Sequence, residues 1–97
     1  MKVVAAPLFV EQYASVRRYY IHHLQAVDYV HRLRSEVSRV RELLRNNPLL
    51  GHPEQEYQTE GLRSIVVARH YKILYRICDD VCRLEQFWDC RNNPELL

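Results

Sequence analysis

Three apolar runs follow one another in the C-terminal third of the chain, within residues 62–94. They are rich in Val, Ile, Tyr, Phe and Trp, and the polar pairs Arg69-His70 and Asp79-Asp80 interrupt them. Such runs with short polar breaks are typical of an antiparallel meander of strands. The Asp pair suits a tight reversal, because Asp tolerates left-handed backbone and can hydrogen-bond its own backbone.

Two helices are predicted ahead of this meander. Residues 2–6 form a short apolar run that predicts a first strand, and Pro7 suits the first turn of a helix, where its missing N–H costs nothing. Apolar side chains then recur at helical spacing in two stretches. The first stretch contains Phe9, Tyr13, Val16, Tyr20 and Leu24, and the second contains Val27, Val30, Leu33, Val37, Val40 and Leu44. Pro48 ends the second helix, because proline disfavours helical backbone in the residue before it.

The predicted order of elements is β-α-α-β-β-β, which places the chain in the α+β class. Because a short link joins the helices, we expect an N-terminal helix hairpin packed on one face of an antiparallel sheet. The acidic segment 48–61, which carries three Glu and no Lys or Arg, connects this hairpin to the meander. At 97 residues, we expect residues 1–97 to form a single domain with one modest core.

The register of the meander follows if each polar pair is a two-residue loop. Arg76 then lies opposite Arg83, and Arg63 lies opposite Arg76. This register predicts a row of Arg63, Arg76 and Arg83 across one sheet face, with Lys72 one step along. The other face then forms the core, with Val66, Tyr71, Ile73, Tyr75, Ile77, Leu84 and Trp88.

A row of like charges across a sheet is destabilising and calls for a reason. One interpretation is an anionic partner, either nucleic acid phosphate or an acidic polypeptide. The other is a solvated face on which Glu85 and water relieve the repulsion. Arginine outnumbers lysine twelve to two, which suits bidentate contacts with phosphate or carboxylate, although a GC-rich genome gives the same bias. Both interpretations stay open, since a one-residue change in either turn would scatter the row.

The three cysteines, Cys78, Cys82 and Cys90, include no C-x-x-C pair. Because the first strand begins close to Met1, with no signal peptide before it, we expect a reducing, cytoplasmic setting. The predicted register places Cys78 and Cys82 on opposite faces, so we expect no metal site, and no cofactor is expected. Nor is any apolar run long enough to cross a membrane.

Four short segments together resemble the RelE/ParE superfamily of toxins from bacterial type II toxin–antitoxin systems. They are the opening K-V-V-A-A-P, the pair Leu62-Arg63, the stretch H-Y-K-I-L-Y-R-I-C-D-D and the ending F-W-D-C-R-N-N-P. Each motif is short, but their order and spacing cover nearly the whole chain. In this superfamily the RelE-like branch cleaves messenger RNA on the ribosome without a metal, and the ParE-like branch inhibits DNA gyrase by binding it.

The resemblance is nearer to the ParE-like branch. The ending R-N-N-P resembles the R-x-x-P close of ParE-like chains, and no His or Tyr follows Tyr75 to act as an acid or base. The resemblance therefore implies a gyrase inhibitor with no firm catalytic residues. A RelE-like endoribonuclease is the alternative, with His70 and Tyr71 as acid–base candidates, and a degenerate toxin that keeps only antitoxin binding is a third reading.

Each of these readings implies a cognate antitoxin, either ParD-like or another acidic and partly disordered protein. The target would be DNA gyrase or, alternatively, the ribosome and its messenger RNA. The residues expected to bind target or antitoxin are the basic ones: Arg63, Lys72, Arg76, Arg83 and Arg91.

Overall fold

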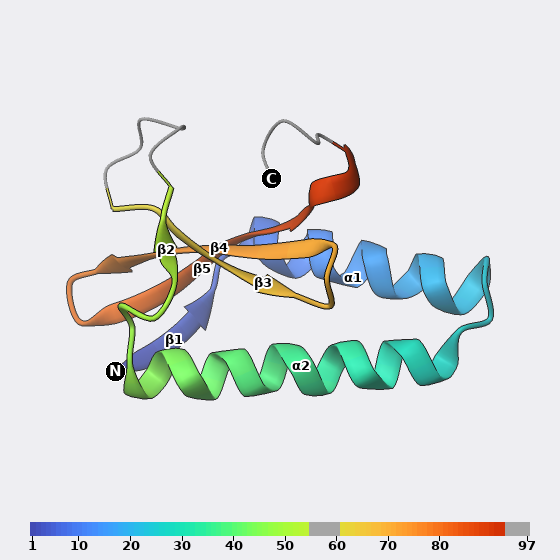
Figure 1. Cartoon of the computed structure of the whole chain (residues 1–97), viewed down its shortest axis with the longest axis horizontal. Helices are drawn as coiled ribbons and strands as arrows, with labels where there is room; N and C mark the ends of the chain where they lie inside the picture. Colours follow the sequence, from blue (N-terminus) through green and yellow to red (C-terminus); the bar gives the residue numbers. More distant parts are fainter. Residues whose placement is uncertain (55–60, 93–97) are drawn as a thin grey trace.

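The computed structural model describes residues 1–54 and 61–92. Its elements are β1 (Lys2–Ala5), α1 (Pro7–His22), α2 (Val27–Asn46), β2 (His52–Pro53), β3 (Arg63–Val67), β4 (Tyr71–Cys78), β5 (Val81–Asp89) and the 3-10 helix η1 (Cys90–Asn92). The helices run antiparallel and side by side, joined by a short turn (Figure 1). The α+β class and the helix hairpin are therefore confirmed.

The described strands form one five-stranded sheet in the order β1-β5-β4-β3-β2. The three strands of the meander pair antiparallel as predicted, and β1 pairs in parallel with β5. The sheet is therefore antiparallel as predicted except at this edge, where β1 lies alongside the last strand of the chain. The structure also adds β2, a two-residue strand within the acidic segment that pairs with β3.

The helices form where the apolar spacing predicts. Pro7 opens α1, and the backbone N–H of Ala6 just before it donates to the carbonyl of Leu84 at 2.8 Å, which fixes the helix start on β5. The α2 stripe from Val30 to Leu44 is buried as expected. Leu24 and Val27 are exceptions to the prediction: Leu24 lies beyond the end of α1 and is 53% exposed, and Val27, at the start of α2, is 51% exposed.

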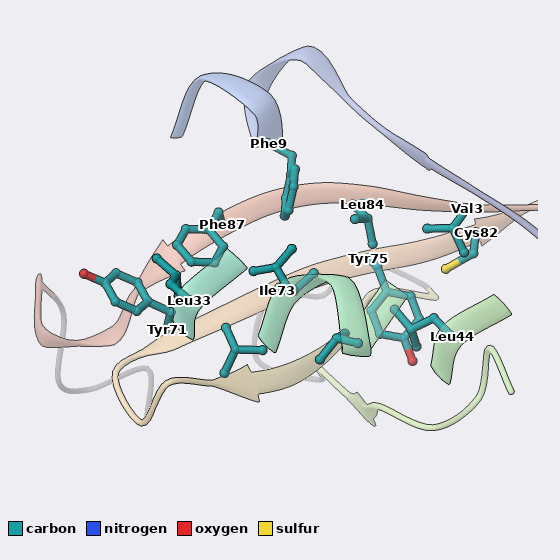
Figure 2. Close-up of a cluster of buried hydrophobic side chains, with 13 residues drawn as sticks. Val3, Phe9, Leu33, Leu44, Tyr71, Ile73, Tyr75, Cys82, Leu84 and Phe87 are labelled. Carbon is teal, nitrogen blue, oxygen red and sulfur yellow. The ribbon is translucent and has the colours of Figure 1, made fainter. Parts of the chain in front are cut away.

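The core lies between the helix hairpin and one face of the sheet (Figure 2). Tyr71 stacks on Phe87 with ring centroids 4.9 Å apart, and Phe87 meets Phe9 edge-on at 5.9 Å. At the other end of the core, Tyr75 and Leu44 are completely buried. Each large side chain removed from water in this way stabilises the fold by about 1.5–3 kcal/mol.

The predicted register is right for one hairpin of the meander and wrong for the other. Asp79-Asp80 is the predicted two-residue turn, so Arg76 lies opposite Arg83. The β3–β4 turn instead has three residues, because Val67 lies opposite Tyr71. Ala68 and Arg69 in this turn adopt φ of 50° and 68°, a left-handed conformation that neither residue type signals in the sequence.

A β-bulge in β5 changes the side-chain alternation a second time. Leu74 pairs with Gln86 but Tyr75 pairs with Leu84, so Glu85 is an extra residue on β5. Beyond the bulge, Phe87 faces the core and Trp88 does not. The predicted core is therefore wrong at Trp88, and the longer turn makes it wrong at Val66, which is 55% exposed while its neighbour Val67 is buried.

Candidate functional site

Arg76 and Arg83 form a basic pair on the sheet face that points away from the helices. They lie directly opposite one another on β4 and β5, next to strand positions whose side chains enter the core. Glu85, the bulged residue, contacts both: its carboxylate lies 3.4 Å from Nε of Arg76 and 3.5 Å from Nε of Arg83. Arg83 remains half-exposed. We call Arg76, Arg83 and Glu85 the basic patch.

Arg63 does not belong to this patch, so the predicted row of three arginines is wrong. With the three-residue turn, Arg63 lies opposite Tyr75. Its guanidinium donates from Nη1 to the carbonyl of Gly51 at 2.7 Å and to that of Leu49 at 3.3 Å. The Tyr75 hydroxyl secures the same segment, since it accepts from the Gly51 N–H and donates to the Pro48 carbonyl, both at 2.8 Å. Arg63 thus holds the connection after α2.

Lys72 is held in a largely buried polar group beside β2. Its ammonium lies 3.1 Å from Oε1 of Glu54, and the two side chains are only 15% and 12% exposed. The Ser64 hydroxyl donates to the same carboxylate oxygen. Breaking such a desolvated pair leaves a buried charge without its counter-charge, so removal of either Lys72 or Glu54 would destabilise the fold.

Arg91 lies at the opposite end of the β4–β5 hairpin, in a cluster on the helix side of the sheet. It forms a bidentate pair with Asp89, from Nε to Oδ1 and from Nη2 to Oδ2, both at 3.0 Å. Nη2 also donates to the hydroxyl of Tyr71 at 3.0 Å and more weakly to that of Tyr20 at 3.5 Å. The Tyr71 hydroxyl in turn donates to Tyr20 at 3.3 Å.

In this cluster the pKa values of the two tyrosines shift in opposite directions. Burial, together with the nearby hydroxyl of Tyr20, raises the pKa of Tyr71 well above its usual range. Burial also acts to raise the pKa of Tyr20, but the hydrogen bonds from Tyr71 and Arg91 outweigh it and leave the pKa of Tyr20 below its usual value. For Asp89, hydrogen bonds from Arg91 likewise outweigh burial and lower the pKa of the carboxyl.

The acid–base candidates and the basic patch are not brought together. Tyr71 faces the helices, whereas Arg76 lies five residues along β4 on the other face, about 17 Å away at the usual rise per strand residue. His70 is exposed in the β3–β4 turn, where its backbone carbonyl accepts from the Cys90 N–H. Arg91 does contact Tyr71, but the guanidinium is paired with Asp89, and the raised pKa keeps the Tyr71 phenol protonated, so that it does not accept a proton as a general base would.

Sequence reasoning missed the partners that decide where the predicted residues lie. Glu54, Tyr20 and Asp89 each contact a basic residue singled out above. Asp89 carried a local signal, because it stands two residues before Arg91. The sequence predicts Tyr20 only as part of the core stripe of its helix and Glu54 only as part of an acidic connection, because the basic residue that each contacts lies in a distant segment.

Cys78, Cys82 and Cys90 are all free thiols within residues 1–54 and 61–92. Cys78 and Cys82 occupy opposite faces of their hairpin as predicted, and no three His, Cys, Asp or Glu side chains of this part converge as a metal site would need. Within the same residues, neither helix has the length and apolar character to span a bilayer.

Comparison with known proteins agrees with this architecture. Residues 3–92 match the family model described as "ParE toxin of type II toxin-antitoxin system, parDE". A search among curated proteins found no match. Among solved structures, the chromosomal ParDE toxin–antitoxin system of P. aeruginosa matches with a TM-score of 0.69 at 13% identity, over 92% of this chain and 95% of that one.

The E. coli DinJ-YafQ complex matches with a TM-score of 0.65 at 16% identity, over 95% of this chain and 96% of the other. At these identities the structural matches establish the shared fold, and the family model establishes the relationship. The chain belongs to the ParE toxin family of type II toxin–antitoxin systems.

Proposed function

We propose that this toxin acts by binding and inhibiting DNA gyrase, with the basic patch as a docking surface. The observation that most supports this proposal is that the basic patch and the acid–base candidates lie on different parts of the sheet. Arg76 and Arg83, which are 30% and 49% exposed, lie on the helix-free face, and the acid–base candidates lie at the far end of the hairpin, on the helix side or in the turn. A toxin that acts by binding needs only the arginines. A metal-independent nuclease needs the arginines and the acid–base residues together around one phosphate.

The same patch is proposed to receive the antitoxin. The solved structures that share this fold were determined as toxin–antitoxin assemblies, and an acidic antitoxin segment would add further carboxylate contacts to those that Glu85 makes with Arg76 and Arg83. Contact charges of this kind guide association and specificity. Glu85 then has a second role, because its bulged position tunes how much positive charge the patch presents.

Changing Arg76 and Arg83 to Glu tests the shared docking surface. We expect the affinity for the cognate antitoxin to fall severalfold or more, because two attractive contacts become repulsive. The measurement is calorimetric titration of the purified toxin with its antitoxin. The matched control changes Arg32 and Arg39, on the outer side of α2, to Glu; unchanged affinity in the patch variant, or an equal loss in the control, would contradict charge docking.

The target itself is tested in growing cells in which the toxin is induced without its antitoxin. Messenger RNA 5′ ends are mapped in parallel with plasmid supercoiling and DNA breaks. The proposal predicts relaxed or broken DNA with uncut messages. New cuts within ribosome-occupied codons and intact DNA would instead indicate an endoribonuclease, and the absence of both effects would indicate a degenerate toxin.

A further inference from the structure

A second site lies on the helix side of the molecule, at the C-terminal half of α1. It consists of two adjoining cavities of about 510 and 390 Å³, which share Ser15 and Tyr19 in their walls. The larger, which we call the aromatic cavity, adjoins the Arg91 cluster. The smaller, which we call the cationic cavity, is lined additionally by Arg18, His22 and His23. None of these residues belongs to the basic patch.

The aromatic cavity has the character of a site for a planar heteroaromatic ring. Val16, Leu24 and the rings of Tyr19 and Tyr20 supply apolar and aromatic walls, and its volume lies in the range of roughly 300–1,000 Å³ usual for small-ligand pockets. Tyr19 is half-exposed, and one face of its ring stacks on His23 with the centroids 5.2 Å apart, so a ligand ring would stack on the other face or displace His23. Stacking on an exposed aromatic ring accepts any planar base.

Hydrogen-bonding groups of both kinds are available at the edge of this cavity. Within the described chain, Arg91 uses Nε and Nη2 for its contacts with Asp89, Tyr71 and Tyr20, and Nη1 donates to no acceptor. Asp89 supplies carboxylate oxygens beside it and is still partly exposed. A fixed donor next to a fixed acceptor matches the edge of a nucleobase, which carries both.

The cationic cavity offers the groups that a phosphate requires. Arg18 reaches Glu11 only at 3.5 Å, with the two side chains 57% and 74% exposed, so this pair is weak and its guanidinium can exchange partners. His22 and His23 lie one turn further along the helix and add two imidazoles. Guanidinium and imidazole donors together are a common means of holding a phosphate group.

We propose that the two cavities bind one nucleoside monophosphate, with the base in the aromatic cavity and the phosphate in the cationic cavity. The inference is independent of the proposed gyrase inhibition, because the two sites share no residue and lie on opposite sides of the sheet. It gives the toxin a small-molecule site apart from the basic patch.

The test is a titration of the ¹⁵N,¹³C-labelled full-length chain with guanosine and adenosine monophosphates, followed by NMR. We expect saturable shifts of the Tyr19, Tyr20 and Arg91 side-chain resonances, with weaker binding of the bare nucleosides and of ribose 5-phosphate, which each occupy one cavity. No saturable shift with either nucleotide would overturn the proposal. Binding of a single-stranded oligonucleotide alone, with shifts at Arg76 and Arg83, would also overturn it.

Two variants test which side chains contribute to nucleotide binding. Tyr19→Ala removes the exposed stacking ring and should weaken nucleotide binding roughly five- to hundredfold, the range for one base–aromatic stack. Arg18→Gln should weaken nucleotide binding severalfold while leaving nucleoside binding unchanged. Arg39→Gln is the matched control, because its side chain is exposed to the same degree (58%) and also pairs with a Glu. Equal effects of Arg18→Gln and Arg39→Gln would contradict a phosphate site at Arg18.

Discussion

Replacing Glu85 with Gln tests whether electrostatics organise the basic patch. The carboxylate lies 3.4 and 3.5 Å from two arginines that face one another across β4 and β5. Arg83 is half-exposed, whereas Arg76 and Glu85 are only 30% and 21% exposed. An ion pair near the surface contributes about 0.2–1 kcal/mol, so the two contacts together are worth about 1 kcal/mol. Like charges directly opposite in a sheet then add repulsion of similar size.

We therefore expect Glu85→Gln to lower the free energy of unfolding by about 1–2 kcal/mol, which is roughly 4–16 °C in Tm for a domain of this size. Urea unfolding at low salt measures this loss in the free energy of unfolding. Repeating it at about 1 M NaCl, where the screening length falls to about 3 Å, tests whether the loss is electrostatic. The cost should shrink at high salt. It should also be smaller when Arg83 is already Gln, because one attractive contact and the repulsion are then gone.

Glu36→Gln is the matched control, since Glu36 pairs with Arg39 on the exposed side of α2. Its expected cost is only about 0.2–0.5 kcal/mol. A loss of stability in Glu85→Gln that is equal at low and high salt would refute the electrostatic account, because salt does not screen packing. A loss no larger than that of the control would refute it as well.

Two further predictions concern Gly51, in the connection after α2, and Asp89, at the end of β5. Gly51→Ala should destabilise the fold by about 1–3 kcal/mol in urea unfolding, because the added Cβ would lie 2.7 Å from the Tyr75 hydroxyl and 2.6 Å from a backbone oxygen of β3; wild-type stability would show that the connection after α2 moves freely. Asp89→Asn should flatten the acid limb of the stability profile. The pKa of Asp89 is lowered in the fold by its Arg91 contacts, so the carboxylate stabilises the protein above its unfolded pKa of about 4 and that contribution is lost as pH falls through the lower folded value. An unchanged acid limb would contradict the assigned role of the pair.

The sequence determines the helices more completely than the sheet. The α2 stripe from Val30 to Leu44 is buried as its spacing predicts, because helical periodicity is a local property. The Asp79-Asp80 turn was also recognisable, since Asp79 adopts the positive φ that Asp tolerates. These local signals were enough for the class of fold and for the family resemblance.

The register of the sheet depends on features that leave no local trace. The three-residue turn uses left-handed Ala68 and Arg69 where Gly or Asn would have been the signal, and the bulge at Glu85 is visible only once β4 and β5 are paired. Each feature changes side-chain alternation by one residue, which moves every following side chain to the other face. Trp88 and Arg63 were misplaced for this reason.

The predicted basic surface was therefore correct in part. Arg76 and Arg83 lie opposite one another as the predicted Asp79-Asp80 turn requires, and Glu85 contacts both. Lys72 and Arg91 pair instead with Glu54 and Asp89. The R-N-N-P ending falls partly on residues 93–97, which lie outside the described residues. Segment 55–60 of the acidic connection also lies outside them.

The most direct test of the central claim is a supercoiling assay with purified DNA gyrase and the purified toxin. The account predicts inhibition by the wild-type chain, loss of at least severalfold in potency when Arg76 and Arg83 are changed to Glu, and full potency when Arg32 and Arg39 on α2 are changed instead. Unimpaired supercoiling at saturating wild-type toxin, or equal potency of the patch variant and the wild type, would contradict gyrase binding through this face.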